Sequence, residues 1–202
     1  MRILFQGDSV TEADRNKNDP SDLGPGYCRT AAEILTEKRP DVGFTFFNRG
    51  ISGHRAIDLY NRFQTDFLDL RPDVVTILVG VNDSMHRTND VYRYSSNESF
   101  RYYYESILLG LKRANAKIVM LEPFCLPNPA LHSFRFDLIP KIDVVRELAS
   151  VYADRFVLLD GPLWLDAMEN GIHHLTDDGV HPNAAGRVWL GEKVAEAVLS
   201  VI

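Results

Sequence analysis

Four short segments of the sequence carry the residue types that hydrolytic enzymes use. They supply, in order, a hydroxyl group, flexible backbone N–H groups, a carboxamide, and a carboxylate with an imidazole. The segments are residues 7–9 (GDS), 50–53 (GISG), 80–83 (GVND) and 178–181 (DGVH). A hydroxyl beside an imidazole and a carboxylate can act as a nucleophile, and amide donors can stabilise the oxyanion that its attack produces.

The fourth segment places Asp178 and His181 three residues apart in a turn that contains glycine. The carboxylate can reach the Nδ1–H group of the imidazole, which leaves Nε2 free to take the proton of a serine hydroxyl. An alternative interpretation is that the pair caps a helix that begins near Asn183. A second alternative is a metal site. Its candidate ligands are His173, His174, Asp177 and His181. Their spacing matches no established zinc motif.

Ser9, Gly53 and Asn82 are the candidates for a nucleophile and its oxyanion donors. Ser9 follows an apolar run and can project from the end of a strand. Gly53 lacks a Cβ, so its backbone N–H can approach a ligand closely, and the Asn82 amide can donate to the same oxygen. Taken singly, each segment is ordinary turn chemistry. Four such segments that all follow strands or precede a helix favour one catalytic site.

Short apolar runs alternate along the chain with segments of helical periodicity. The runs predict strands at residues 2–5, 44–47, 74–79, 118–121 and 156–159. The periodic segments predict helices at residues 27–38, 56–70, 98–115, 138–154 and 183–201. Continuously apolar strands suit a sheet that is covered on both faces, and crossover helices imply parallel pairing. The sequence therefore predicts an α/β fold with a five-stranded parallel sheet.

Two of the predicted helices have a defined apolar stripe. The stripe of the second helix is Ile57, Tyr60, Phe63, Phe67 and Leu70. The stripe of the last helix, whose members are predicted to be buried, is Val188, Leu190, Val194, Val198 and Val201. The loops at residues 8–25, 81–97 and 160–182 follow strands directly. They should gather at the carboxyl edge of the sheet, where open α/β folds bind their ligands.

These segments together resemble those of the SGNH, or GDSL, hydrolase superfamily. The matching blocks are residues 5–11 (FQGDSVT), 48–53 (NRGISG), 80–83 (GVND) and 178–182 (DGVHP). The resemblance implies that Ser9 is the nucleophile, His181 the base and Asp178 its orienting partner. It also implies an oxyanion hole formed by the backbone N–H groups of Ser9 and Gly53 and the side chain of Asn82. The implied fold is a flavodoxin-like three-layer α/β/α sandwich, with residues 1–202 as a single domain.

Within the superfamily, residues 48–58 and the Gly26-Tyr27 pair look most like the short bacterial carbohydrate esterases, which include acetyl xylan esterases. The expected function is a serine esterase that removes short acyl groups, acetyl foremost, from carbohydrate esters through an acyl-enzyme on Ser9. One alternative is a lysophospholipase or thioesterase, which needs a long apolar channel beside Ser9. Another is a catalytically silent carbohydrate-binding module, against which the intact set of segments argues.

Polar residues dominate the loops after the first and third predicted strands, which favours a short acyl group over a fatty chain. These residues are Asp14, Arg15, Asn16, Lys17, Asn18, Asp19, Asn82, Asp83, His86, Arg87, Asn89 and Asp90. The charged stretch of the first loop, which includes Asp14, Arg15 and Lys17, is predicted to be solvated. Either residues 81–97 or residues 122–136 are expected to form the acyl pocket.

The composition narrows the classes of protein to which the chain can belong. Its 202 residues are 45% hydrophobic and 25% charged, as in globular domains, and the net charge of −6 disfavours binding to nucleic acid. The expected partner is a small-molecule or oligosaccharide ester. No apolar run reaches the ~18 residues of a membrane span, and no signal peptide is apparent, so we expect a cytoplasmic protein. Cys28 and Cys125 are expected to be buried thiols. We expect no metal or organic cofactor, and homo-oligomerisation is left open.

Overall fold

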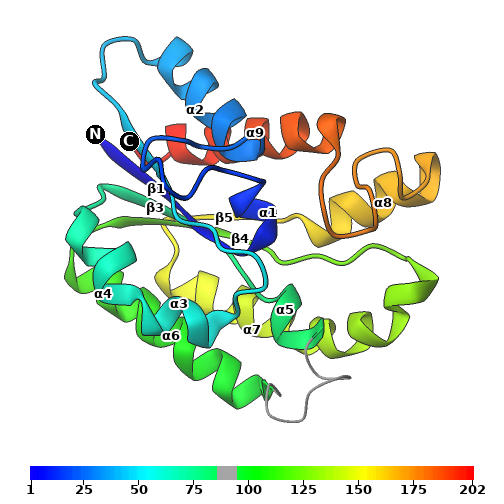
Figure 1. The fold of residues 1–202 in the computed structure, drawn as a ribbon. Helices are drawn as coiled ribbons and strands as arrows, with labels where there is room; N and C mark the ends of the chain where they lie inside the picture. The colour runs from blue at the N-terminus through cyan, green and yellow to red at the C-terminus, as the bar shows by residue number, and fades with distance from the viewer. Residues whose placement is uncertain (86–94) are drawn as a thin grey trace.

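The protein forms a five-stranded sheet between two layers of helices, seen in a computed structural model that describes residues 1–85 and 95–202 (Figure 1). The strands are β1 (Arg2–Gly7), β2 (Thr45–Asn48), β3 (Val74–Leu78), β4 (Lys117–Leu121) and β5 (Arg155–Val157). Their spatial order is β2-β1-β3-β4-β5, and every pairing is parallel. This arrangement confirms the predicted α/β sandwich.

The helices divide between the two faces of the sheet. They are α1 (Ser9–Glu12), α2 (Tyr27–Lys38), α3 (Ala56–Asn61), α4 (Phe63–Asp66), α5 (Val81–Met85), α6 (Asn97–Arg113), α7 (His132–Tyr152), α8 (Asp160–Asn170) and α9 (Ala184–Leu199). Figure 1 shows α2 and α9 on one face, with α3, α6 and α7 on the other. Successive strand residues point to opposite faces. Ile3 and Phe5 accordingly pack in the core with α2 and α9, whereas Leu4 packs with α3 and α6.

The order of the strands creates a crevice where the direction of winding reverses. The chain passes from β1 outward to β2 and then returns to β3 on the other side of β1. The loops that follow β1 and β3 therefore leave the sheet side by side and turn to opposite layers. Open α/β sheets bind ligands at such a point, and here these two loops contain Ser9 and Asn82.

The predicted helix over residues 56–70 is instead three short pieces, namely α3, α4 and a 3₁₀ turn at Leu68–Leu70. The break occurs at Arg62, whose backbone leaves the helical range at φ −106° and ψ 18°. The Arg62 guanidinium donates to the carbonyl oxygen of Arg49 at 2.7 Å and pairs with Asp66 at 2.9 Å. These tertiary contacts override the helical periodicity. Tyr60, a member of the predicted apolar stripe, is 38% exposed.

Other elements differ from the sequence prediction in extent. α7 begins at His132, six residues earlier than predicted, and continues through Pro140. α8 lies in a segment that was predicted to be irregular, and it opens with a Gly-Pro pair that disguises its helical pattern. Val188 was predicted to be buried but is 49% exposed, because the buried stripe of α9 consists of Leu190, Val194 and Val198.

The two cysteines are free and buried, as predicted. Burial raises the pKa of the Cys125 thiol to about 11 and that of Cys28 still further. Within the described part of the chain, no helix is both long enough and apolar enough to cross a membrane.

The contact between α2 and α9 depends on a glycine, and this generates the first prediction. A Cβ at position 191 would lie 2.5 Å from the Cβ of Thr30 and 3.1 Å from the carbonyl oxygen of Tyr27. Gly191→Ala should lower the free energy of unfolding by about 1–3 kcal/mol through overpacking, although alanine is the better helix former by ~1 kcal/mol. Urea unfolding monitored by circular dichroism measures this change.

Gly161 provides the matched control, since it lies in α8 and a Cβ there would meet nothing within 4 Å. Gly161→Ala should leave stability unchanged or raise it. Equal effects of the two substitutions would contradict the packing argument.

Candidate active site

The first loop presents Ser9 at the carboxyl end of the sheet. β1 ends at Gly7, and Ser9 begins the single-turn helix α1. Asp8 is the N-cap of that helix, because its carboxylate accepts a hydrogen bond from the backbone N–H of Val10 at 3.0 Å. The turn of helix thus holds Ser9 at a fixed place at the edge of the sheet.

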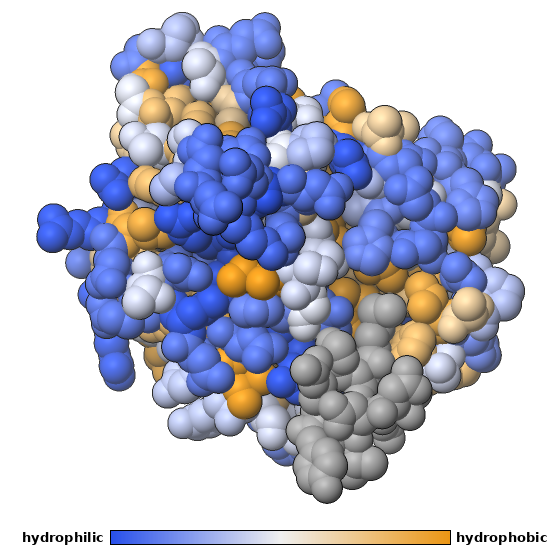
Figure 2. Space-filling view, in the orientation of Figure 1, coloured by the Kyte–Doolittle hydropathy of each residue, from blue (hydrophilic) through white to orange (hydrophobic). Residues whose placement is uncertain are grey.

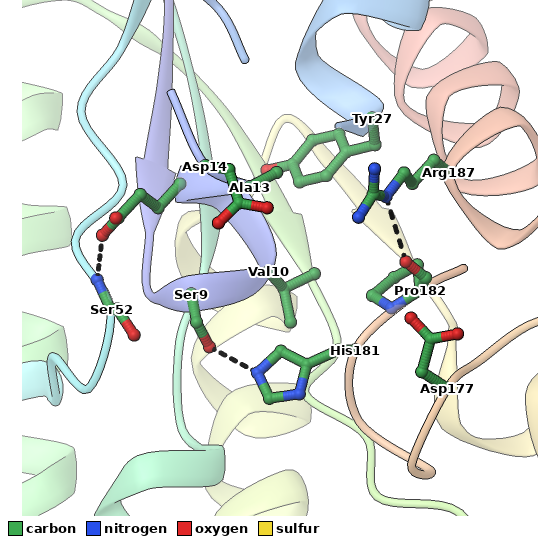
Figure 3. Close-up of a pocket in the computed structure, with 11 residues that line it drawn as sticks. Ser9, Val10, Ala13, Asp14, Tyr27, Ser52, Asp177, His181, Pro182 and Arg187 are labelled. Atoms are coloured by element: carbon green, nitrogen blue, oxygen red, sulfur yellow. Dashed lines mark hydrogen bonds between the residues drawn. The ribbon is translucent and has the colours of Figure 1, made fainter. Parts of the chain in front are cut away.

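A chain of hydrogen bonds connects Ser9 to His181 and Asp178. The Ser9 Oγ atom lies 2.9 Å from His181 Nε2 (Figure 3). His181 Nδ1 lies 2.7 Å from Asp178 Oδ2. An ionised carboxylate only accepts hydrogen bonds, so the proton between His181 and Asp178 belongs to Nδ1. Nε2 is then the acceptor for the Ser9 hydroxyl. This arrangement can withdraw the hydroxyl proton when the oxygen attacks an electrophile.

The turn that carries Asp178 and His181 is built around the carboxylate. Asp178 Oδ1 accepts backbone N–H groups from Val180 at 2.9 Å and from His181 at 2.8 Å. Gly179 adopts φ +95°, in the left-handed region that favours glycine. Partial burial raises the pKa of Asp178, but the hydrogen bonds from His181 and Val180 outweigh burial and leave the pKa below its usual value. Asp178 is therefore held in its charged, accepting form.

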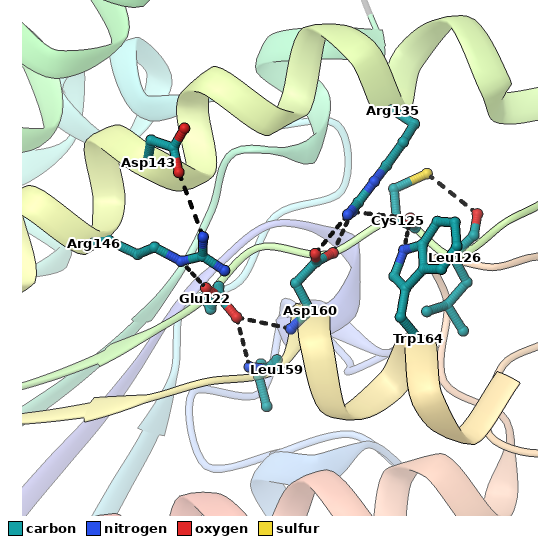
Figure 4. A network of polar contacts seen from close by, with 9 residues as sticks. All are labelled: Glu122, Cys125, Leu126, Arg135, Asp143, Arg146, Leu159, Asp160 and Trp164. Carbon is teal, nitrogen blue, oxygen red and sulfur yellow. Dashed lines mark hydrogen bonds and ion pairs between the residues drawn. The ribbon is translucent and has the colours of Figure 1, made fainter. Parts of the chain in front are cut away.

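Residues that follow β4 support this turn from below. The backbone N–H of Leu126 donates to the carbonyl oxygen of Gly179 at 2.8 Å, and the Asn128 amide donates to that of Asp178 at 2.8 Å. Glu122, which directly follows β4, fixes the start of this segment. It is fully buried and accepts the backbone N–H groups of Leu159 and Asp160 at 3.0 and 2.9 Å (Figure 4).

Two arginines of α7 complete this network (Figure 4). Arg146 pairs with Glu122 at 2.7 Å. Arg135 forms a bidentate pair with Asp160 and donates to the carbonyl oxygen of Cys125 at 3.3 Å. The network ties β4, β5, α7 and α8 together beneath the Asp178 turn. None of its charged members was singled out from the sequence, because the pairing is visible only once the strands are in register.

The predicted oxyanion donors lie on two segments that are bonded to each other. The Asn82 amide donates to the carbonyl oxygen of His54 at 3.2 Å, which ties α5 to the loop that carries Gly53. Gly53 has φ +77°. The same loop is attached to β1 by the N–H of Ile51, which donates to the carbonyl oxygen of Gly7 at 3.2 Å. Among the described residues, neither Gly53 nor Asn82 is hydrogen-bonded to Ser9.

A polar cavity of about 330 Å³ opens in front of Ser9 and His181 (Figure 3). Its other lining residues include Glu12, Asp14, Tyr27, Ser52, Asp177 and Arg187. Glu12 accepts the backbone N–H of Ser52 and pairs with Lys17 at 3.0 Å. The charged stretch of the first loop was predicted to be solvated, and for part of it this prediction is wrong. Its Arg15 is buried and donates to the carbonyl oxygen of Gly50 at 3.2 Å.

Other predicted residues lie elsewhere. Of the polar loop residues named from the sequence, His86, Arg87, Asn89 and Asp90 are outside the described residues, as is most of the loop at 81–97.

The four residues proposed as an alternative metal site do not come together as a ligand set. His174 lies 2.9 Å from the carboxylate of Asp166, and the described residues contain no group of three or more His, Cys, Asp or Glu side chains that could hold a metal ion.

Comparison with known proteins identifies the family of the chain. The model of the GDSL-like lipase/acylhydrolase family matches residues 5–188. The chain belongs to this family. The family match and an acetylxylan esterase homologue show that this protein is a carboxylic ester hydrolase.

Individual relatives cover almost the whole chain. An acetylxylan esterase from Geobacillus stearothermophilus is 28% identical over 199 residues, which span 94% of this chain and 90% of the relative. A crystal structure described as a GDSL-like lipase from Parabacteroides merdae superposes with a TM-score of 0.91 at 29% identity, covering 98% of this chain and 95% of the other. The crystal structure of the acetylxylan esterase Axe2 from G. stearothermophilus has the same fold, with a TM-score of 0.84 at 24% identity and coverage of 99% and 93%.

Two carboxyl groups of this hydrolase are buried next to the predicted site residues. Burial raises the pKa of Asp8 to about 7, although the hydrogen bond from Val10 lowers it in part. Burial likewise raises the pKa of Asp83 to about 6, against hydrogen bonds from the Ser95 hydroxyl and the Ala56 N–H. In an unfolded chain both groups titrate near 4.

These raised pKa values predict how stability depends on pH. Between pH 4 and pH 7 the folded protein binds more protons at Asp8 than the unfolded chain does, so its contribution to stability falls as the pH rises. Asp8→Asn should therefore reduce the loss of unfolding free energy between pH 5 and pH 8, as measured by urea unfolding at each pH.

The control is Asp19→Asn. Hydrogen bonds from Ser21 lower the pKa of this exposed carboxyl, so its contribution to stability changes only at acid pH. It should leave the difference between pH 5 and pH 8 as in the wild type. An Asp8→Asn protein with an unaltered pH dependence would show that Asp8 does not carry the effect.

Proposed function

We propose that this ester hydrolase removes short acyl groups, acetyl foremost, from carbohydrate esters through an acyl-enzyme on Ser9. The observation that carries the proposal is the hydrogen-bonded chain from Ser9 Oγ through His181 to Asp178, with distances of 2.9 and 2.7 Å, at the mouth of a polar cavity. The acetylxylan esterase relative supports the choice of acetyl and carbohydrate.

The reaction proceeds in two halves. Ser9 Oγ attacks the carbonyl carbon of the ester while its proton passes to His181 Nε2, and Asp178 stabilises the imidazolium that forms. The tetrahedral intermediate then breaks its bond to the alcohol oxygen, which leaves with the proton from His181. Water attacks the acyl-enzyme by the same route, and the carboxylic acid leaves while Ser9 recovers its proton. The chemistry requires no metal or organic cofactor.

The oxyanion of each tetrahedral intermediate is stabilised by the backbone N–H groups of Ser9 and Gly53 and by the Asn82 amide. Asn82 is 8% exposed, so its donor acts in a site with little competing water. Its bond to the His54 carbonyl uses one amide hydrogen and leaves the second for the oxyanion.

A second candidate function, hydrolysis of long-chain esters, is favoured by an apolar groove beside the Asp178 turn. Its apolar lining includes Leu126, Pro127, Pro129, Phe136, Ile139 and Trp164, and its volume is about 640 Å³. Figure 2 shows apolar surface gathered over the start of α7, whereas the surface around α1 is predominantly hydrophilic. Most of the lining comes from residues 122–136, one of the two segments predicted to form the acyl pocket. Neither Ser9 nor His181 lines it, which favours the short-chain function.

The nucleophile is tested by Ser9→Ala. Loss of the attacking oxygen should lower kcat for p-nitrophenyl acetate by about 10³- to 10⁶-fold and abolish labelling by a fluorophosphonate, which bonds covalently to activated serines. Ser150→Ala, on an exposed turn of α7, is the control and should keep both properties. More than about a tenth of the wild-type rate in a folded Ser9→Ala protein, a loss of less than ~1.4 kcal/mol, would exclude Ser9 as the nucleophile.

The acyl preference is tested with p-nitrophenyl esters from acetate to octanoate. An acyl chain that is well accommodated gains ~0.8 kcal/mol for each buried CH₂ group, whereas the polar cavity offers little apolar surface. We expect kcat/KM to be highest for acetate and to fall beyond butyrate. A maximum at octanoate, lost in Phe136→Ser, would instead assign the groove to the acyl chain and favour a lysophospholipase or thioesterase.

A further inference from the structure

Asp14 stands on a strained stretch of backbone at the rim of the cavity. Ala13 has φ +42° and Asp14 has φ +56°, so two consecutive residues with side chains occupy the left-handed region. Side chains disfavour this region because Cβ approaches the following carbonyl oxygen. Strained residues of this kind persist only where the surrounding structure imposes them, and they are concentrated at functional sites.

The surrounding structure imposes the conformation from both sides. After Asp14, the buried Arg15 is anchored by its guanidinium on the carbonyl oxygen of Gly50 at 3.2 Å. Before it, Ala13 packs against the turn at residues 24–26, where a Cβ on Gly26 would lie 2.3 Å from the Cβ of Ala13. The single residue between these two anchors has little freedom, and its side chain is presented to the cavity.

The Asp14 carboxylate points into the cavity without a protein partner. Figure 3 shows it between Ser9 and Arg187. It is exposed, and among the described residues no hydrogen bond or ion pair satisfies it. Glu12, by contrast, is occupied by Ser52 and Lys17.

We infer that Asp14 accepts hydrogen bonds from hydroxyl groups of the alcohol half of the substrate, and so selects esters of neutral polyhydroxylated alcohols. This inference rests on the proposed function, since it requires the alcohol to lie in the cavity in front of Ser9. A free carboxylate forms strong charge-assisted bonds to hydroxyl donors. Its negative charge disfavours anionic alcohols, and an aryl leaving group without hydroxyls gains nothing from it.

Asp14→Gly separates binding from a structural role. Glycine adopts the left-handed conformation without strain and removes the carboxylate. We expect the melting temperature to hold or rise. The ratio of kcat/KM for acetylated xylotriose to that for p-nitrophenyl acetate should fall by about 10- to 100-fold, the loss expected for a hydrogen bond to a charged group. Asp14→Asn tolerates the same backbone and keeps a neutral acceptor, so its ratio should fall less.

Asn115→Gly is the matched control. Asn115 is exposed, has φ +57° and follows α6, away from the cavity. The Asn115→Gly substitution should relieve the same kind of strain. It should leave the ratio of kcat/KM for the two substrates within about twofold of the wild type, well below the effect expected for a lost charged hydrogen bond.

The outcomes are distinguishable. A preserved ratio in Asp14→Gly overturns the inference. A wild-type enzyme that cleaves p-nitrophenyl acetate but no acetylated xylo-oligosaccharide also overturns it, together with the carbohydrate specificity, and leaves the serine esterase intact. A wild type inactive on both substrates overturns the proposed function itself. If Asp14→Gly does not fold, the ratio in Asp14→Asn decides, and a wild-type value there overturns the inference.

Discussion

The hydrogen bond between Ser9 and His181 joins residues that are 172 positions apart, and it depends on the whole sheet being assembled. Ser9 is fixed by β1, an interior strand between β2 and β3, and His181 by the turn that leads into α9. α9 itself packs against α2, so the position of the imidazole is set by the layer on one face of the sheet. An error in strand order or helix packing would separate the two side chains by more than the length of a hydrogen bond.

Two sets of polar contacts hold the loops of the site in fixed positions relative to the sheet. On one side, Glu122 accepts the backbone N–H groups of Leu159 and Asp160 as well as Arg146, and the Asp160 carboxylate accepts Arg135. The chain after Glu122 continues to Leu126, which is bonded to the Asp178 turn. On the other side, Asn82 and Asp83 connect α5 to the loop after β2 through His54 and Ala56. Charged groups of this kind are costly to bury unless they are fully bonded, and a fully bonded network admits few alternative arrangements.

The carboxyl groups around the site differ in charge state, because the pKa of Asp178 is lowered and those of Asp8 and Asp83 are raised. Asp178, held by three hydrogen bonds, remains charged and can stabilise the imidazolium that His181 forms in the proposed reaction. Asp8 and Asp83 are buried, and their raised pKa values lie within a pH unit of neutrality. A negative charge beside Ser9 would oppose the oxyanion of the proposed reaction. The raised pKa leaves Asp8 partly protonated near neutral pH, and Asp83 accepts hydrogen bonds from the Ser95 hydroxyl and the Ala56 N–H.

The sequence by itself determined the class of fold and the residues of the hydrogen-bonded chain. Continuous apolar runs predict buried parallel strands, and motifs such as GDS and DGVH are local in the chain, so both can be identified without tertiary structure. Only the tertiary structure decided the division of residues 56–70 into short helices, the burial of Arg15, and the contacts of Glu122. It also decided that Asp14 faces the cavity rather than solvent alone. Each of these depends on which distant backbone groups come within hydrogen-bonding distance. That is a property of packing, and periodicity along a single chain does not encode it.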